Sequence, residues 1–183
     1  MPPIRKFKRE DIIDTAYNIV KDEGFESINA RRIAKEMGCS IQPIFHNFAT
    51  MDELNKAVYD KISYKCREYM FGEDDKEKAY KHMGLGYISF AKDYPEFFKA
   101  MFMQKTDLDA ESFIMSDFTS DDVVRIGQGL TGYDYEKQKK FHIKVWIFTH
   151  GIACLLATKT VKFTDEEIEE LLVSTVGAMI NEK

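Results

Sequence analysis

The sequence has few of the residues that stabilise small secreted proteins. Its 183 residues include three cysteines, four prolines and one tryptophan. Cys39, Cys66 and Cys154 are widely separated and form no CxxC pair, so a disulfide framework is not expected. We expect a reducing environment in which each cysteine packs as a small apolar residue, with redox sensing as the minor alternative.

Long hydrophobic runs are also missing. No apolar run is long enough to span a bilayer. The first ten residues, MPPIRKFKRE, lack the apolar core of a signal peptide. These absences predict a cytoplasmic protein that does not bind membranes. Hydrophobic residues nevertheless make up 44% of the chain, which is enough for a buried core.

Motifs of catalysis are absent too. The sequence contains no Gly-x-Ser-x-Gly, no Gly-x-x-x-x-Gly-Lys and no Gly-x-Gly-x-x-Gly. The four histidines, His46, His82, His142 and His150, show no metal-ligand spacing. We therefore predict a protein that is not an enzyme and that needs no metal or cofactor.

What is present is helical periodicity from end to end. No strand-like alternation or internal repeat interrupts it, so we predict an all-α fold of about nine helices. Thr50 and Glu53 form a capping box that opens a long helix towards Tyr69. We place a domain boundary inside this helix, which gives an N-terminal domain of residues 1–57 and a C-terminal domain of residues 58–183. The predicted helices cover residues 8–23, 30–37, 40–47, 51–69, 76–92, 95–104, 121–130, 135–159 and 165–180.

Residues 27–54 predict two short helices joined by a tight turn. Asn29 is a candidate N-cap, and Gly38 ends the first short helix because glycine adopts the left-handed conformation without strain. Ser40 is a candidate N-cap for the second. Ile44 and Phe48 are four residues apart and form its buried side. The outward-facing residues are then Ile41, Gln42, Pro43, Phe45, His46 and Asn47.

This pattern is typical of a helix-turn-helix, whose second helix enters the major groove of DNA. Exposed Gln and Asn side chains can pair with base edges, and apolar side chains can contact a thymine methyl group. An ordinary helical hairpin without DNA affinity is the alternative that spacing alone leaves open.

Charge is unevenly distributed, although the net charge is −5. Residues 1–48 contain eight basic and seven acidic residues, a net charge of +1, whereas the rest contain eighteen and twenty-four, a net charge of −6. Basic residues precede the first helix and open the second, where they can contact phosphate. The acidic remainder is not expected to touch DNA.

The run from Ile12 to Leu54 resembles the N-terminal domain of TetR-family transcriptional regulators. The features that carry the resemblance are Ile12, Ile13 and Ala16, then Gly24-Phe25, Arg32-Ile33-Ala34, Gly38-Cys39-Ser40, Ile44 to Phe48, and Asp52-Glu53-Leu54. Together with the outward-facing pattern, it gives a predicted DNA-binding set of Arg5, Lys8, Asn29, Arg31, Ser40, Ile41, Gln42, Pro43, Phe45, His46 and Asn47.

Two positions depart from that family. It usually has Tyr where this chain has Phe45 and Lys where it has Met51. Both usual residues tend to contact phosphate, so the resemblance implies a weaker grip on the DNA backbone or one supplied by other residues.

Two long apolar helices end the chain, and the first is apolar on two sides. Such helices suit a four-helix interface between two copies, and the resemblance implies the same arrangement. The alternative is that they pack only on their own chain. The predicted dimer residues are Ile152, Leu156, Leu172, Val176 and Met179.

The C-terminal domain also resembles a subset of the family with a Trp-His-Gly C-terminal domain, through Tyr94, Pro95, Phe97, Phe98, Trp146, His150 and Gly151. The family resemblance implies an effector cavity. The candidate effector residues are Tyr87, Met101, Phe102, Trp146 and His150, although aromatic residues and methionines also form ordinary cores.

The predicted function is that of a ligand-responsive DNA-binding regulator. We expect a homodimeric repressor that binds a palindromic operator in double-stranded DNA and is released by a small, largely apolar effector. The alternative is a protein-interaction module with the same fold and weakened or lost DNA binding.

Overall fold

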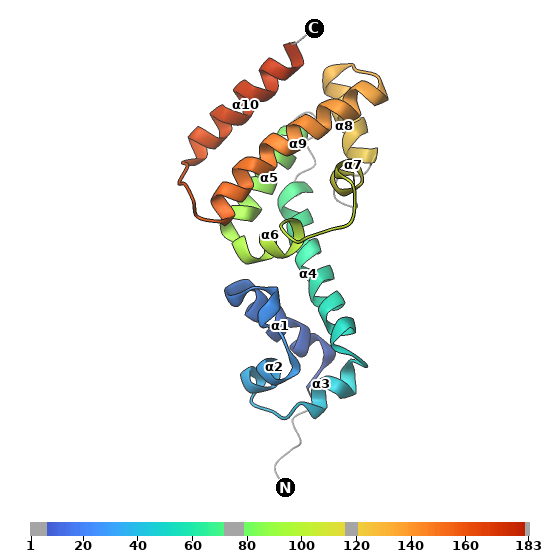
Figure 1. The fold of residues 1–183 in the computed structure, drawn as a ribbon, viewed down its shortest axis with the longest axis vertical. Coiled ribbons are helices and arrows are strands. Elements are labelled where there is room, and N and C mark those ends of the chain that lie inside the picture. Colours follow the sequence, from blue (N-terminus) through green and yellow to red (C-terminus); the bar gives the residue numbers. More distant parts are fainter. Residues whose placement is uncertain (1–6, 72–78, 116–120, 182–183) are drawn as a thin grey trace. The chain divides into compact units, whose positions relative to one another are not determined.

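The computed structural model describes residues 7–71, 79–115 and 121–181. Within these residues the chain forms ten α-helices and one short 3-10 helix, η1, with no strand (Figure 1). The all-α prediction is therefore confirmed. None of the described helices is both long enough and apolar enough to cross a bilayer. The elements are α1 (Arg9–Glu23), η1 (Phe25–Ser27), α2 (Ala30–Met37), α3 (Gln42–Asn47), α4 (Met51–Phe71), α5 (Ala79–Asp93), α6 (Pro95–Phe102), α7 (Ala110–Ile114), α8 (Asp121–Thr131), α9 (Tyr135–Ala157) and α10 (Asp165–Asn181).

The chain divides into two compact units. The N-terminal unit comprises Met1–Lys65 and Glu96–Met103, and the C-terminal unit comprises Cys66–Pro95 and Gln104–Lys183. The division falls inside α4, beyond the boundary that we placed after residue 57. α6 groups with the N-terminal unit, where the Phe97 ring lies 4.6 Å from the Tyr17 ring of α1. Sequence order gave no sign of this grouping, because the two helices are far apart in the chain.

The helix-turn-helix of the N-terminal unit forms largely as its cap residues predict. Asn29 Oδ1 accepts a hydrogen bond from Arg32 N at 2.9 Å, so Asn29 caps α2. Gly38 ends α2 with a φ of 66°, a conformation that strains other residues. Ile33, Ile44 and Phe48 are buried and hold the helices together.

Ser40 is not the N-cap of α3, so that prediction was wrong. The N-cap is Ile41, which makes no side-chain cap hydrogen bond. The helix begins without a side-chain cap because Ile41 has no side-chain oxygen and the second helical residue, Pro43, has no N–H that would need a partner.

Two threonine–glutamate capping boxes, one at α4 and one at α10, form to different extents. At α10, Thr164 Oγ1 accepts from Glu167 N at 3.2 Å and the Glu167 carboxylate accepts from Thr164 N at 2.8 Å, which is the complete box. At α4, Thr50 Oγ1 accepts from Glu53 N at 3.2 Å. The Glu53 carboxylate, however, accepts from Ala49 N, one residue earlier than predicted.

In the C-terminal unit, α9 packs against α5 and α8, and α10 lies beside α9 (Figure 1). Two ion pairs join α5 to α10: Lys81 with Glu169 at 2.5 Å and Lys92 with Asp165 at 2.6 Å. α7 is a single short helix between residues 104 and 121, where we predicted no helix, and the side chain of Asp109 caps it.

Candidate nucleic-acid interface

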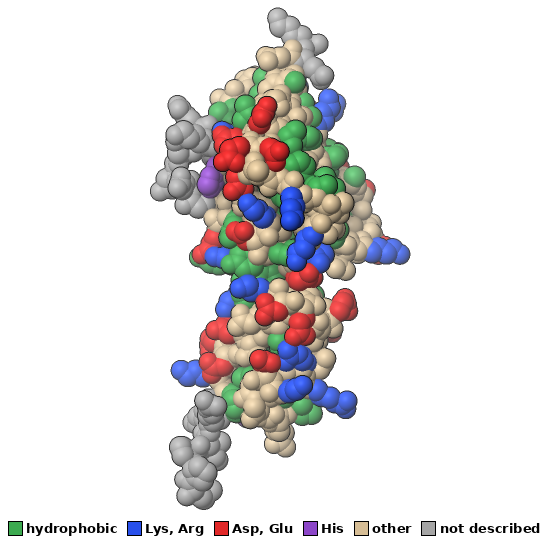
Figure 2. Space-filling model, turned by 90° about the vertical axis from the view of Figure 1, so that its left-hand side faces the viewer, with side chains coloured by type: hydrophobic (Ala, Val, Ile, Leu, Met, Phe, Trp, Pro, Cys, Tyr) green, Lys and Arg blue, Asp and Glu red, His purple; other side chains and the backbone are tan. Residues whose placement is uncertain are grey.

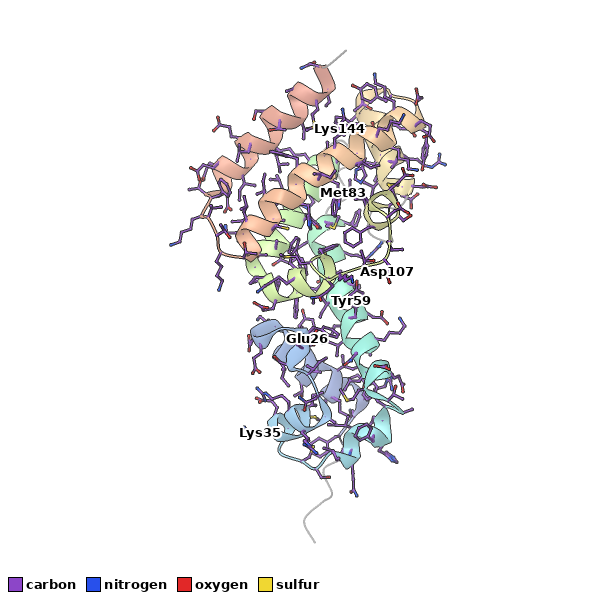
Figure 3. The ribbon with its side chains drawn as sticks, in the orientation of Figure 1. Glu26, Lys35, Tyr59, Met83, Asp107 and Lys144 are labelled. Carbon is purple, nitrogen blue, oxygen red and sulfur yellow. The ribbon has the colours of Figure 1, made fainter. Side chains whose placement is uncertain are left out.

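The outer face of α3 carries exposed side chains of the kinds that contact bases. Gln42 and His46 are exposed, and the two large hydrophobic residues Ile41 and Phe45 are 43% and 46% exposed. Ile44, by contrast, is fully buried, as its spacing predicts. The N-cap residue and the six-residue helix therefore present both apolar and amide groups to their surroundings. Figure 3 shows side chains that project outward from this part of the N-terminal unit.

Arg9 holds α3 in place. Its guanidinium donates to the carbonyl oxygen of Asn47 at 2.6 Å, forms an ion pair with Glu53 at 2.9 Å, and lies 3.9 Å from the centre of the Phe48 ring. The Ala49 N–H and Arg9 together lower the pKa of Glu53. Arg9 thus joins the starts of α1 and α4 to the end of α3.

Asn47 has a structural role that sequence reasoning missed. Its side-chain amide donates to the carbonyl oxygens of Pro43 at 2.8 Å and of Phe7 at 3.3 Å. Both amide hydrogens are therefore engaged by backbone, although we predicted Asn47 as a base-reading residue. The residue fixes the segment before α1 beside α3.

The polar residues at the start of α2 differ in whether their side chains are already bonded within the chain or are free to contact DNA. The Oδ1 atom of Asn29 is occupied by its capping role. Arg32 forms ion pairs with Glu23 and Glu36, both at 2.6 Å. Arg31 is exposed and forms no ion pair with any residue that the structure describes. Arg31 is thus the arginine of α2 that remains available to an outside partner.

An open groove brings much of the predicted DNA-binding set together. Its lining residues are Phe7, Lys8, Ser40, Gln42, Pro43, His46 and Asn47. Ile41 and Phe45 lie elsewhere on the exposed surface of α3, and Arg5 lies outside the described residues. On the face drawn in Figure 2, basic and acidic side chains alternate over the N-terminal unit rather than forming one basic patch.

The predicted effector residues are only partly brought together. Tyr87 Oη lies 2.9 Å from His150 Nδ1, and the Trp146 ring stacks on the His150 ring with centroids 4.5 Å apart. His150 Nε2 lies 3.2 Å from Cys154 Sγ, so both ring nitrogens have partners, and burial lowers the pKa of His150. Met101 and Phe102 lie on α6, in the other unit.

The predicted dimer residues are largely covered within the protomer. Ile152 and Leu172 are each only 5% exposed, and the other three are partly buried. The same two helices carry hydrophobic residues that remain exposed, namely Ile147, Leu155, Leu171, Val173 and Ile180. These residues are the ones still available to a second copy.

Sequence reasoning also missed a cavity in the C-terminal unit. It has a volume of about 260 Å³ and is walled partly by Tyr80, Gln138 and Phe141. Gln138 lies three and seven residues before Phe141 and Val145, on the stripe that α9 buries, and a polar residue at that spacing is the signal that could have revealed the cavity. No group of three or more His, Cys, Asp or Glu residues suited to a metal ion occurs in the described part of the chain.

Comparison with known proteins agrees with this geometry. Residues 12–58 match the family model described as bacterial regulatory proteins, tetR family. The HTH-type transcriptional regulator PksA of Bacillus subtilis (strain 168) is 32% identical over 65 residues, which are 33% of this chain and 32% of PksA. The alignment thus spans about a third of the length of that curated relative.

A solved structure extends the similarity of the fold to almost the whole chain. The TetR-like transcriptional regulator from Rhodococcus sp. RHA1 has a TM-score of 0.70 with 16% sequence identity, over 99% of this chain and 100% of that chain. At this identity the match concerns the fold.

Proposed function

On the premise that this chain is a TetR-family transcriptional regulator, we propose that it binds a specific palindromic DNA site as a homodimer in the cytoplasm. The observation that carries the proposal is the exposed face of α3 beside the groove that Lys8, Ser40 and Gln42 line. A two-fold dimer would place two α3 helices in successive major grooves and double the number of base contacts.

The side chains suggest distinct roles at the DNA. The Gln42 amide would pair with adenine, and the apolar surfaces of Ile41 and Phe45 would contact thymine methyl groups. Lys8, Arg31 and Ser40 would contact phosphates, which contributes affinity without sequence preference. Phe45 lacks a hydroxyl for phosphate, so the backbone contacts depend more on these three residues.

Selection of bound sequences from a random duplex pool tests the proposal. We expect an inverted repeat to be enriched. Replacing Gln42 with alanine should weaken binding to the selected site by about 1–3 kcal/mol and relax the preference at one position in each half-site. Asn18→Ala, which removes an exposed amide from α1, serves as the matched control and should change neither property.

Dimerisation would use the exposed hydrophobic residues of α9 and α10. Figure 2 shows hydrophobic side chains at the surface of the C-terminal unit among charged ones. Ile147→Glu should shift the protein from dimer to monomer in sedimentation experiments, because a charge in an apolar interface lacks a partner. Val161→Glu places the same charge on an exposed hydrophobic residue outside both helices and should leave the dimer intact.

We further propose that the protein is a repressor released by a small molecule. The cavity of the C-terminal unit and the continuity of α4 from one unit into the other support this reading. A ligand changes DNA affinity only if it binds the DNA-competent and the released states with different affinity.

A protein-interaction module is the second candidate. The exposure of both Ile41 and Phe45 on one short helix favours it, because neighbouring exposed hydrophobic residues mark interaction surfaces. Under this alternative the random-pool selection enriches no sequence, and Gln42→Ala leaves all binding unchanged.

A further inference from the structure

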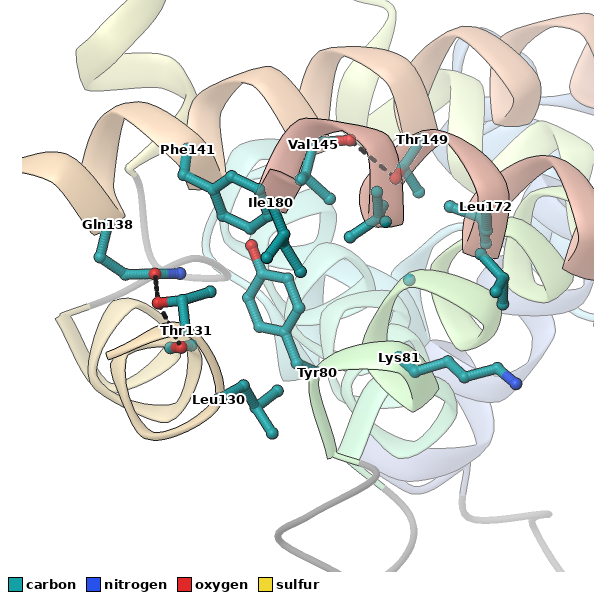
Figure 4. A pocket seen from close by; sticks show the side chains of 15 residues that line it. Tyr80, Lys81, Leu130, Thr131, Gln138, Phe141, Val145, Thr149, Leu172 and Ile180 are labelled. Carbon is teal, nitrogen blue, oxygen red and sulfur yellow. Dashed lines mark hydrogen bonds between the residues drawn. The ribbon is translucent and has the colours of Figure 1, made fainter. Parts of the chain in front are cut away.

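The cavity of the C-terminal unit lies under α10, is lined by residues of α5, α8, α9 and α10, and is partly open to solvent (Figure 4). Leu172, Val176 and Ile180 of α10 contribute apolar side chains to one wall. The polar lining residues are few. Lys81 is one of them, and its ammonium group pairs with Glu169 at 2.5 Å. The cavity is therefore an apolar space without an unpaired charged side chain among its lining residues.

Gln138 of α9 is the unusual residue of the cavity lining. Its side chain is fully buried, and its Oε1 atom lies 2.6 Å from Thr131 Oγ1. Thr131 Oγ1 lies 3.2 Å from the carbonyl oxygen of Gly127, so its single proton is donated to the nearer oxygen of Gln138. The amide oxygen therefore has a donor, whereas Gln138 Nε2 has no hydrogen-bond partner among the described residues. Figure 4 shows this nitrogen on the side that points towards Tyr80 and Phe141.

Gly127 makes room for this amide. A Cβ atom at residue 127 would overlap Gln138 Nε2, so only glycine allows the amide to occupy its position. A buried N–H without a partner opposes folding, and an apolar side chain of the same shape would pack without that cost. The glutamine and the glycine together therefore provide a hydrogen-bond donor that no described residue of the chain uses.

A second buried nitrogen, Nε2 of His142, belongs to a residue that lines a neighbouring cavity. Tyr80 Oη is 2.9 Å from His142 Nδ1, and His142 Nε2 is buried without a partner in the part of the chain that the structure describes. His142 lines a neighbouring cavity of about 50 Å³, which shares Tyr80, Gly84, Val145 and Thr149 with the larger one. That space is too small for an organic ligand, so the larger cavity is the candidate binding site.

We propose that the cavity beneath α10 binds a small, uncharged, largely apolar molecule whose carbonyl or ether oxygen accepts a hydrogen bond from Gln138 Nε2. The assignment of this molecule as the effector rests on the proposed function. The volume of 260 Å³ exceeds the roughly 150 Å³ of an apolar cavity that holds benzene, so a bicyclic ring of about ten carbons is the expected size.

The test compares two molecules of nearly the same shape, 1-tetralone and the hydrocarbon tetralin, in NMR titrations of the full chain without DNA. The wild type should bind the ketone about tenfold more tightly than the hydrocarbon, the difference expected of one buried hydrogen bond. Gln138→Met should bind both with the affinity that the wild type has for tetralin. Equal binding of the two molecules by the wild type, or a preference that persists in Gln138→Met, would overturn the proposal.

A second variant tests the place of binding. Gly177 lies on α10, lines the cavity and has no atom within 4 Å of an added Cβ. Gly177→Leu should fill the space and abolish binding of both molecules, while the leucine favours the helix. Gly129→Leu makes the same change at an exposed helical glycine that does not line the cavity, and binding should persist. Binding that survives Gly177→Leu would place the molecules elsewhere and overturn the assignment.

These titrations and the DNA selection fail independently. Ketone binding through Gln138 without any enriched DNA sequence would leave the cavity assignment standing and remove the regulatory role. An enriched operator without ketone binding would leave the DNA-binding proposal standing and remove the cavity assignment.

Discussion

The two units of this chain differ in how fully their polar side chains are hydrogen-bonded. In the N-terminal unit, Arg9, Arg32 and Asn47 each bond to two or more groups of their own unit. In the C-terminal unit, Gln138 and His142 each bury a nitrogen that bonds to nothing in the described residues. Among the described residues of the N-terminal unit, Asn55 Oδ1 is the one comparable atom.

The difference follows from where each unit would meet a partner. A surface that reads DNA needs its short helix held in a fixed position. The side chains that hold α3 therefore bond within the unit, while Gln42 and His46 stay exposed. The proposed ligand cavity leaves the Gln138 amide N–H free to bond to a ligand, whereas His142 lines only the smaller space, which cannot hold an organic ligand. Four substitutions or conditions can break or sharpen this contrast.

The largest effect should come from Gly86→Ala in α5. A Cβ atom there would overlap the carbonyl group of Tyr69 in α4, and backbone cannot yield as a flexible side chain can. We expect the C-terminal unit to lose about 3 kcal/mol of unfolding free energy, measured by Trp146 fluorescence in urea. The matched control is Gly84→Ala, whose Cβ has room, with its nearest neighbour, Leu172 Cδ1, at 4.0 Å. It should gain about 0.5–1 kcal/mol. Equal effects of the two changes would contradict the close crossing of α4 and α5.

The next effect is a loss of stability in acid caused by His142. Burial lowers its pKa to about 4, whereas the unfolded chain titrates near the ordinary value of 6.5. Between these values the unfolded state binds a proton that the folded state does not, so stability falls as pH falls from about 6.5 to 4. The loss is on the order of 3 kcal/mol.

Urea unfolding followed by circular dichroism at several pH values measures this loss. His142→Gln should remove that part of the pH dependence. The control His82→Gln, at another histidine of the C-terminal unit, should retain it. If the unfolding free energy of the wild type changed with pH as it does in His142→Gln, His142 would not be responsible.

Asn47→Ala should cause an intermediate loss of stability. Unlike Gln42→Ala, it should not change which DNA sequence is preferred. Without the amide, the segment at Phe7 loses its bond to α3, and we expect a loss of about 1–2 kcal/mol of stability in the N-terminal unit. DNA affinity should fall equally for all sequences. A loss confined to one base position would instead restore the direct reading role that the sequence suggested for Asn47.

The smallest effect should come from Asn29→Ala, which removes the cap of α2. We expect a loss of about 1 kcal/mol, whereas Asn29→Asp should retain most of the stability because aspartate also caps. Amide hydrogen exchange can localise the loss to the N-terminal unit. Increased exchange at α10 would mean that the two units do not unfold separately.

The sequence could specify those features that depend on neighbours along the chain. The capping hydrogen bonds of Asn29 and Thr164, the left-handed turn at Gly38 and the burial of Ile44 and Phe48 all involve residues a few positions apart. Local backbone geometry decides the caps and the turn, and the helical period places Ile44 and Phe48 on the same side of the chain. The exposed face of α3, and with it the candidate DNA interface, followed from that periodicity.

Features that depend on distant residues could not be predicted in this way. Periodicity marks Asn47 as a residue of the outer face of α3, but only the folded chain brings its amide to Phe7, forty residues earlier. Likewise, Ile152 and Leu172 carry the apolar pattern of an interface, yet their own unit already buries them.

The candidate ligand site shows the same limit most clearly. Gln138, Gly127 and Tyr80 come from three helices, and no spacing along the chain relates them. Local sequence thus determined the helices, their ends and the residues that α3 exposes, because these depend on interactions within a few residues. Which polar groups find partners and which are left facing a cavity was decided by the tertiary structure, because burial removes water and leaves each group only the neighbours that packing supplies.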